Sequence, residues 1–252
     1  MAARTPTSTA TTTITSTERP IDTLDLLASG PLLRLLHLCS PALPIGAFAY
    51  SQGLEPATTA GWIRDEAEAL RWIVSLIDAQ LASLDLPILA RLYDAWGDGD
   101  GAEPPAVATW SAYLLASRPT SELQAEERHL GGALARVLAG LGLPEAGAWM
   151  TRPEVTYAAM FSLAARRWSV PLTAAAQGFA FAWTEAQTSA AVRLVPLGQS
   201  AGQRILAAAG ATIPAAVVRA LALPAEEIGA SAPRLALASA WHETQYSRLF
   251  RS

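Results

Sequence analysis

The chain has 252 residues, of which 18 are basic and 22 are Asp or Glu, giving a formal net charge of −4 and a sequence pI near 5.4. All basic residues are Arg, which excludes a P-loop lysine, a lysine Schiff base and a Ser-x-x-Lys nucleophile. Because no block of five like charges occurs, we expect no nucleic-acid partner.

The residue types favour helices over strands. Ala occurs 53 times and Leu 35 times, whereas Val and Ile together reach only 19, too few to furnish the central strands of a large parallel sheet. No change in composition after residue 20 marks a second domain. We therefore predict an all-α, single-domain helical bundle of roughly eight to ten helices.

The first residues, the lone cysteine and the longest apolar stretch bear on where the protein is located. Residues 1–19 are dominated by Thr and Ser and lack the apolar region of a secretory signal, so they predict a disordered tail ahead of a helical domain at 20–252. Cys39 allows no intramolecular disulfide and fits a reducing cytosol. The longest apolar stretch, Val170–Trp183, is shorter than the ~18 to 20 residues that span a bilayer. We expect a cytoplasmic protein without a membrane partner.

Apolar periodicity locates the helices. Between Ile63 and Leu81 apolar residues recur at alternating steps of three and four, which predicts one helix face. We predict further helices at 106–117, 120–140, 153–168, 171–194, 200–210, 212–222 and 233–250, with a loop at Gly97–Pro105. The helix at Pro171–Leu194 is rich in Ala and allows close approach of other backbones, so we expect it at the centre of the bundle or at a dimer seam.

The run Gly198–Gly202 reads Gly-Gln-Ser-Ala-Gly and matches the nucleophile elbow of α/β-hydrolases. An acid at 226 or 227 and then His242 follow in the hydrolase order. The elbow needs a strand before it, however, and Pro196 would remove a ladder donor from that strand. We favour a structural interpretation, in which Gly198 ends one helix and Ser200 caps the next. A serine hydrolase is the alternative.

The histidines do not predict a metal site. His37 and Cys39 are two residues apart and would point away from each other on a helix. His129 and His242 have no neighbouring histidine or cysteine at ligand spacing. We expect no resident metal and no cofactor.

Two segments are not explained by a simple bundle. Ser40–Ala57 is too rich in proline and glycine for one helix and too apolar for a free loop, so it must pack against something. In the last segment, Trp241–Ser252, a helix would align His242, Tyr246 and Phe250 in an apolar stripe. Such a helix would cover the core or dock a partner.

These two segments, together with Ala190–Leu206, resemble the signature stretches of the urease accessory protein UreF family, and the resemblance extends from about Leu32 to Ser252. It implies an all-α, non-catalytic, homodimeric chaperone. Such a protein joins UreD (UreH in some organisms) and the GTPase UreG on apo-urease for nickel insertion. The resemblance also implies that the assembled complex handles nickel and GTP, that the scaffold modulates GTP hydrolysis by UreG, and that the C-terminal segment becomes ordered on UreD.

The resemblance further implies a set of partner-binding residues. They are Tyr50, Gln52 and Glu55 in the first segment, Arg193, Pro196, Gly198 and Gln199 in the middle one, and Tyr246, Arg248, Leu249, Phe250 and Arg251 in the last. One position departs from the family pattern. Ala47 stands where many members have glycine, and alanine would resist a left-handed backbone there.

Overall fold

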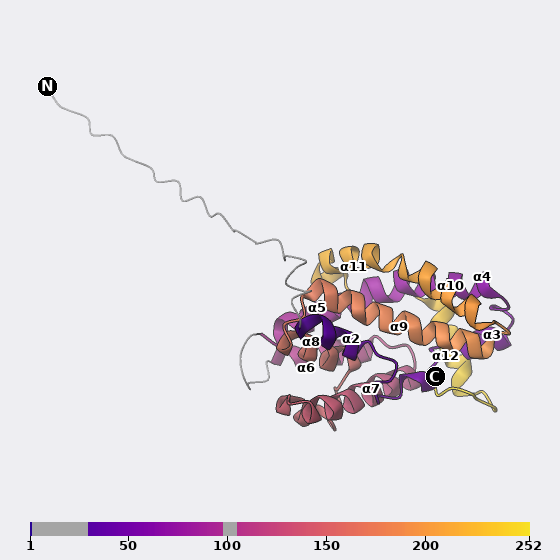
Figure 1. Ribbon diagram of the computed structural model, residues 1–252, viewed down its shortest axis with the longest axis horizontal. Helices are drawn as coiled ribbons and strands as arrows, with labels where there is room; N and C mark the ends of the chain where they lie inside the picture. Colours follow the sequence, from indigo (N-terminus) through magenta and orange to yellow (C-terminus); the bar gives the residue numbers. More distant parts are fainter. Residues whose placement is uncertain (2–29, 98–104) are drawn as a thin grey trace.

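The structure, a computed structural model, describes residue 1 and residues 30–97 and 105–252 (Figure 1). The α-helices of the described residues are α2 (Gly30–Leu38), α3 (Leu54–Thr59), α4 (Glu66–Leu76), α5 (Leu86–Ala95), α6 (Pro105–Ala116), α7 (Ser121–Gly140), α8 (Tyr157–Arg167), α9 (Leu172–Leu194), α10 (Gln199–Gly210), α11 (Ile213–Ala222) and α12 (Pro233–Glu243). No strand occurs among these residues, which confirms the predicted all-α bundle. The predicted tail at 1–19 and most of the loop at 97–105 lie outside the described residues.

Helix α9 occupies the centre of the bundle, as its small side chains predict. It packs against α2, α3, α4, α5, α8, α10 and α11, and it runs through the middle of Figure 1, with α10 and α11 above it. A Cβ atom added to Gly178 would lie 2.6 Å from Leu35 Cδ1 on α2, and one added to Gly202 on α10 would lie 2.7 Å from Val192 Cγ2. Glycine at these two positions permits the close contacts.

The helix predicted at 63–81 begins later and ends much later. It starts at Glu66 because the Asp65 side chain caps it, accepting from Glu68 N at 2.8 Å. It then continues through a π-helical stretch, Ile77–Asp85, into α5. Pro87 cannot donate to the carbonyl of Ser83 one turn earlier. That carbonyl instead accepts from Gly229 N at 2.9 Å, so the proline does not end the helix.

Other predicted helix ends need correction. Helix α8 begins at Tyr157, since the Thr156 side chain accepts from Ala159 N at 3.1 Å and caps it, so the predicted start at 153 is wrong. Helix α9 ends at Leu194, before Pro196, and Gly198 is the N-cap of α10. Ser200 therefore lies within the first turn of α10, and neither proposed capping role, for Gly198 or for Ser200, is correct.

Two helical stretches are long and apolar enough to cross a membrane by length and composition alone. In the apolar 18-residue window of residues 66–95, 72% is buried inside the protein, as in a core helix, and in that of residues 199–222, 33% is buried. On the second stretch, Arg204 and Arg219 form ion pairs with Glu66 and Asp78. One or two such helices are weak evidence for a membrane protein, because core helices pass the same test.

Two adjacent glycines in the middle of α7 bring this helix against the segment before α8. A Cβ atom added to Gly131 would lie 2.6 Å from the carbonyl carbon of Thr156, and one added to Gly132 would lie 2.9 Å from Met150 O. Both contacts are with backbone, which cannot rotate away. The His-Leu-Gly-Gly run that begins at His129 is thus a packing feature of a helix.

We predict that Gly131→Ala lowers the free energy of unfolding by about 1–3 kcal/mol, the usual effect of overpacking. Gly140, at the end of the same helix, is the matched control because an added Cβ would meet nothing within 4 Å. Gly140→Ala should leave stability unchanged or raise it by up to about 1 kcal/mol. Urea unfolding followed by circular dichroism measures both, and equal effects would contradict this account of Gly131.

Candidate functional site: the C-terminal junction

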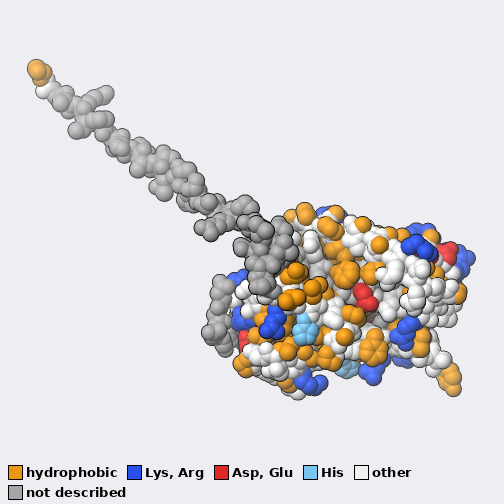
Figure 2. Space-filling view, viewed as in Figure 1, with side chains coloured by type: hydrophobic (Ala, Val, Ile, Leu, Met, Phe, Trp, Pro, Cys, Tyr) orange, Lys and Arg blue, Asp and Glu red, His pale blue; other side chains and the backbone are white. Residues whose placement is uncertain are grey.

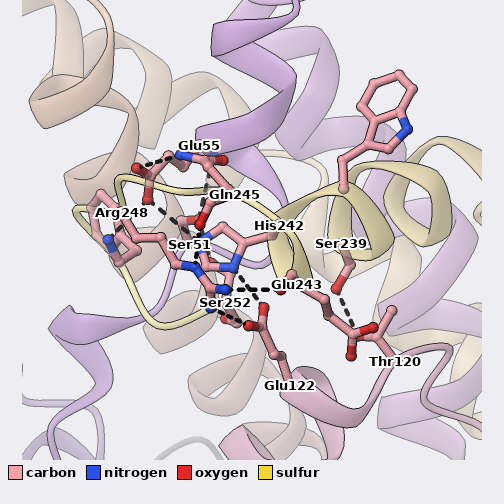
Figure 3. Close-up of polar contacts among 12 residues, drawn as sticks. Ser51, Glu55, Thr120, Glu122, Ser239, His242, Glu243, Gln245, Arg248 and Ser252 are labelled. Carbon is pink, nitrogen blue, oxygen red and sulfur yellow. Dashed lines mark hydrogen bonds and ion pairs between the residues drawn. The ribbon is translucent and has the colours of Figure 1, made fainter.

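The last nine residues, 244–252, turn back on the protein after α12, and we call them the tail. The helix predicted to reach residue 250 ends at Glu243, so the apolar stripe of His242, Tyr246 and Phe250 does not form. Phe250 is buried, at 4% exposure, whereas Tyr246 is fully exposed. The tail follows the start of α3 and the first turns of α7 (Figure 3). We call this contact region the tail junction.

The carboxylate of Glu55 binds backbone amides of the tail. Its Oε1 accepts from Leu249 N at 2.8 Å and from Gln245 Nε2 at 3.1 Å, and its Oε2 accepts from Phe250 N at 2.9 Å. Glu55 is buried in the first turn of α3, where the helix dipole favours a negative charge. These three donors explain why the chain leaves the helical path after α12.

His242 links α12 to two acidic residues. Its Nδ1 lies 2.5 Å from Glu122 Oε2, and its Nε2 lies 3.6 Å from Glu55 Oε2. The other oxygen of Glu122 accepts from Arg248 Nη1 at 2.6 Å. Arg248 also donates to the carbonyls of Gln245 and Glu243, at 2.9 and 2.8 Å, which fixes the turn at the start of the tail.

The end of the tail is buried between α3 and α7. The Ser252 carbonyl accepts from Ser51 N at 3.1 Å and from Ser51 Oγ at 2.5 Å. The Ser252 hydroxyl donates to Glu126 Oε2 at 2.7 Å, and Gln52 Nε2 donates to Glu126 Oε1 at 2.6 Å. Burial raises the pKa of Glu126 to about 7, although these two hydrogen bonds act in the opposite direction.

The Ser40–Ala57 segment packs into this junction, as predicted. Gln52 has a left-handed backbone, with φ +49°, and its side chain is held between Glu126 and the indole of Trp183, whose Nε1 donates to Gln52 Oε1 at 2.7 Å. The left-handed residues here are Gly46, Gln52 and Gly53. Ala47 instead begins a short 3-10 turn, so alanine at this position causes no strain.

Arg193 connects the last turn of α9 to both segments. Its Nη1 donates to the Phe48 carbonyl at 3.0 Å, and its guanidinium lies 4.4 Å from the centre of the Phe250 ring. This cation–π contact adds to the burial of Phe250. Arg193 therefore contacts its own chain at two points while it remains exposed.

The junction gathers most of the positions that the family resemblance implies. Tyr50, Gln52, Glu55, Arg193, Arg248, Leu249, Phe250 and Arg251 lie in it or at its edge, with Arg251 N donating to the Ala49 carbonyl at 2.8 Å. Tyr246 projects into solvent. Pro196, Gly198 and Gln199 lie apart, exposed in the turn between α9 and α10.

Sequence reasoning missed Glu122 and Glu126. Glu122 and Glu126 are one helical turn apart, on the side of α7 that also carries the buried Leu123 and Leu130. Two acids one turn apart beside apolar residues indicate that carboxylates enter the interior. This signal was available in the sequence.

The residues of the hydrolase motif are not arranged as a catalytic triad. His242 contacts Glu122 and Glu55, whereas Glu226 and Glu227 are exposed. Ser200 is preceded by a turn and a helix, and no hydrogen bond joins it to His242 within the described part of the chain. A search of the described residues finds no group of three His, Cys, Asp or Glu side chains that could hold a metal ion.

Comparison with known proteins gives one consistent result. The chain matches the UreF family over residues 63–210. It is 49% identical to the urease accessory protein UreF of Alkalilimnicola ehrlichii over 219 residues, which cover 87% of this chain and 95% of the relative. It is 49% identical to the protein of that name from Azoarcus sp. over 230 residues, 88% of this chain and 96% of the relative. For Chromohalobacter salexigens the identity is 47% over 94% of this chain and the whole relative.

The raised pKa of Glu126 predicts a pH-dependent stability. Between the ordinary carboxyl pKa and about pH 7 the folded protein binds more protons than the unfolded chain, so its free energy of unfolding falls as pH rises through this window. Glu126→Gln removes this titration while the Ser252 hydroxyl can reverse its hydrogen bond. From about pH 4.5 to about pH 7.5, the stability of the variant should rise relative to the natural chain by roughly 3 kcal/mol. Urea unfolding at several pH values measures this, and a constant difference would refute the assignment.

Proposed function

The chain belongs to the UreF family of urease accessory proteins, and on that premise we propose that it is a non-catalytic scaffold for urease maturation in the cytoplasm. In this proposal a homodimer of the chain joins UreD and the GTPase UreG on apo-urease. Nickel is the cargo and GTP the substrate of the assembled complex, so the chain itself needs no resident cofactor. Its influence on GTP hydrolysis would act through contact with UreG.

The observation that carries the proposal is the two-sided tail. One side is fixed by the buried carboxylate of Glu55 and by the buried ring of Phe250. Tyr246 and Leu249 are exposed, and Tyr246 lines a shallow pocket together with the partly exposed Trp241 at the end of α12. Exposed large apolar side chains held on an ordered backbone are typical of protein interfaces. This supports the tail as the docking surface for the UreD partner.

The position of Phe250 changes the expected role of the tail. The resemblance implies a segment that becomes ordered on UreD, with Tyr246 and Phe250 among its partner contacts. In this structure hydrogen bonds already hold the tail, and Phe250 is in contact with Arg193 of its own chain. We therefore propose Tyr246 and Leu249 as the partner contacts, with Phe250 as the internal anchor.

The turn between α9 and α10 is the second proposed contact. Pro196 and Gly198 are exposed there, and Gln199 is exposed at the first position of α10, three to six residues after Arg193. We propose that this turn serves UreG recruitment or the dimer surface. Because Arg193 contacts Phe48 and Phe250, it would act by holding the turn and the tail in one arrangement.

Tyr246→Ala and Phe250→Ala separate the two sides of the tail. Tyr246→Ala should weaken binding to purified UreD by roughly 30-fold or more, with a change in unfolding free energy within about 0.5 kcal/mol. Phe250→Ala should lower that free energy by about 3 kcal/mol, because it opens a cavity. Calorimetric titration with UreD and urea unfolding are the measurements. Undiminished UreD binding by Tyr246→Ala would count against the docking surface.

The absence of lysine and the arrangement of His242 also predict what the purified chain does not do. We expect no binding of labelled GTP and no hydrolysis of a p-nitrophenyl ester above the uncatalysed rate, because neither a phosphate-binding lysine nor a triad is present. If an ester were hydrolysed and Ser200→Ala abolished the rate, the serine hydrolase alternative would replace the scaffold.

A further inference from the structure

Among the charged side chains that line a groove beside the tail junction, all are basic. Its volume is about 420 Å³, and its walls come from α7, the segment around Gly46–Tyr50, Met150 and the end of the tail. The charged and titratable side chains that line it are Arg128, His129, Arg136 and Arg251, with the phenol of Tyr50, and no Asp or Glu is among the described lining residues. In a chain with net charge −4 this is a local reversal. We call it the α7 groove.

Many arginines of the described residues are paired with a carboxylate, but the three arginines of the groove are not. Arg64, Arg118, Arg204, Arg219 and Arg248 each form an ion pair with Asp or Glu. Within the described chain, Arg128, Arg136 and Arg251 form none. Arg128 donates its Nε hydrogen to the Pro153 carbonyl at 2.8 Å, which fixes the side chain and leaves both terminal nitrogens as donors. Arg136 is exposed and has no hydrogen-bond acceptor among the described residues.

The spacing of these charges selects a kind of ligand. Arg128, Gly132 and Arg136 follow one another at steps of four residues, so the Cα atoms of Arg128 and Arg136 lie about 12 Å apart along the axis of α7, and both side chains line the groove. Between them the lining is apolar or small, with Ile45, Ala133 and Met150. A single phosphate would have to draw both side chains together, although the hydrogen bond to the Pro153 carbonyl restrains Arg128. An extended peptide spans this distance in about four residues.

We propose that the α7 groove binds an acidic segment of a partner protein, in which two carboxylates four residues apart flank an apolar side chain. Arg128 and Arg136 would each meet one carboxylate through the two parallel hydrogen bonds that guanidinium permits. The apolar side chain would cover Met150 and Ile45. Figure 2 shows blue side chains along the lower edge of the molecule, where α7 lies in Figure 1. The proposal does not rest on the proposed function, since it names the chemistry of the segment and not its source.

A synthetic peptide tests the proposal with the full chain. Fluorescein-labelled Glu-Ser-Leu-Ser-Glu should raise its fluorescence anisotropy on binding, and Gln-Ser-Leu-Ser-Gln should bind at least about tenfold more weakly. Raising the salt concentration from about 0.05 to about 0.3 M should weaken the binding of the acidic peptide, because salt screens charges in a groove that is open to solvent. Equal binding of the two peptides would overturn the proposal.

Variants of Arg136 locate the binding. Arg136→Glu should weaken the binding of the acidic peptide about tenfold or more. Arg136→Lys should weaken this binding less, because lysine keeps the charge although it lacks the planar pair of donors. Arg71→Glu is the control, since Arg71 is also an exposed helical arginine, with its side chain 69% exposed and only a loose contact, at 3.8 Å, with Glu68, and it lies outside the groove. Circular dichroism should show the same helicity for all three. If Arg136→Glu had no effect, or Arg71→Glu an equal one, the α7 groove would not be the site.

Two further probes decide the class of ligand. Inorganic phosphate should displace the peptide only at concentrations far above that of the peptide itself. Displacement at equal concentration would mean a simple anion site and would overturn the proposal for a protein segment. A twelve-residue oligo-dT should bind more weakly than the acidic peptide. Tighter binding that Arg136→Glu abolishes would assign the groove to nucleic acid instead.

Discussion

The carboxylate of Glu55 needs hydrogen-bond donors because it is buried, and the path of the last nine residues follows from that need. Two of its donors are the backbone amides of Leu249 and Phe250, and a third is the amide of Gln245. A chain that continued α12 as a helix would use the two backbone amides internally and leave the buried carboxyl group of Glu55 without them. The turn after Glu243, the burial of Phe250 and the contact of its ring with Arg193 all depend on this one group.

The predictions from sequence succeeded where the deciding interactions are local. The position of α9 followed from its small residues, and α7 begins where Thr120 caps it. The prediction of a helix through the tail was wrong because the contact that decides the path of the tail joins residues about 195 positions apart. No local sequence pattern contains that contact. His242, Tyr246 and Phe250 do have helical spacing. The backbone amides of Leu249 and Phe250, however, donate to Glu55 and not to carbonyls of a helix. Pro87 is a second case, since the carbonyl that it leaves without a donor is satisfied by Gly229, 146 residues from Ser83.

The sequence predicted which residues belong to the candidate site better than it predicted how they are arranged. The family resemblance supplied the positions along three segments, and the structure brings most of them together around the tail. The resemblance could not supply Glu122 or Glu126, which bind the tail from outside those positions. Their roles depend on which groups are buried together. Glu126 is the clearest example, because its raised pKa comes mainly from burial between Gln52 and Ser252, with a smaller contribution from the adjacent Glu127.

The tail also connects two surfaces of different chemistry. Its Tyr246 and Leu249 face outward as apolar groups, whereas Arg251 lines the basic α7 groove. The amide of Arg251 donates to the Ala49 carbonyl, only two residues before the Ser51 amide that binds Ser252. Since the same short backbone positions all three side chains, the apolar surface and one charge of the groove share a single support. A partner that holds the tail in place on one side thereby also keeps Arg251 at the groove on the other.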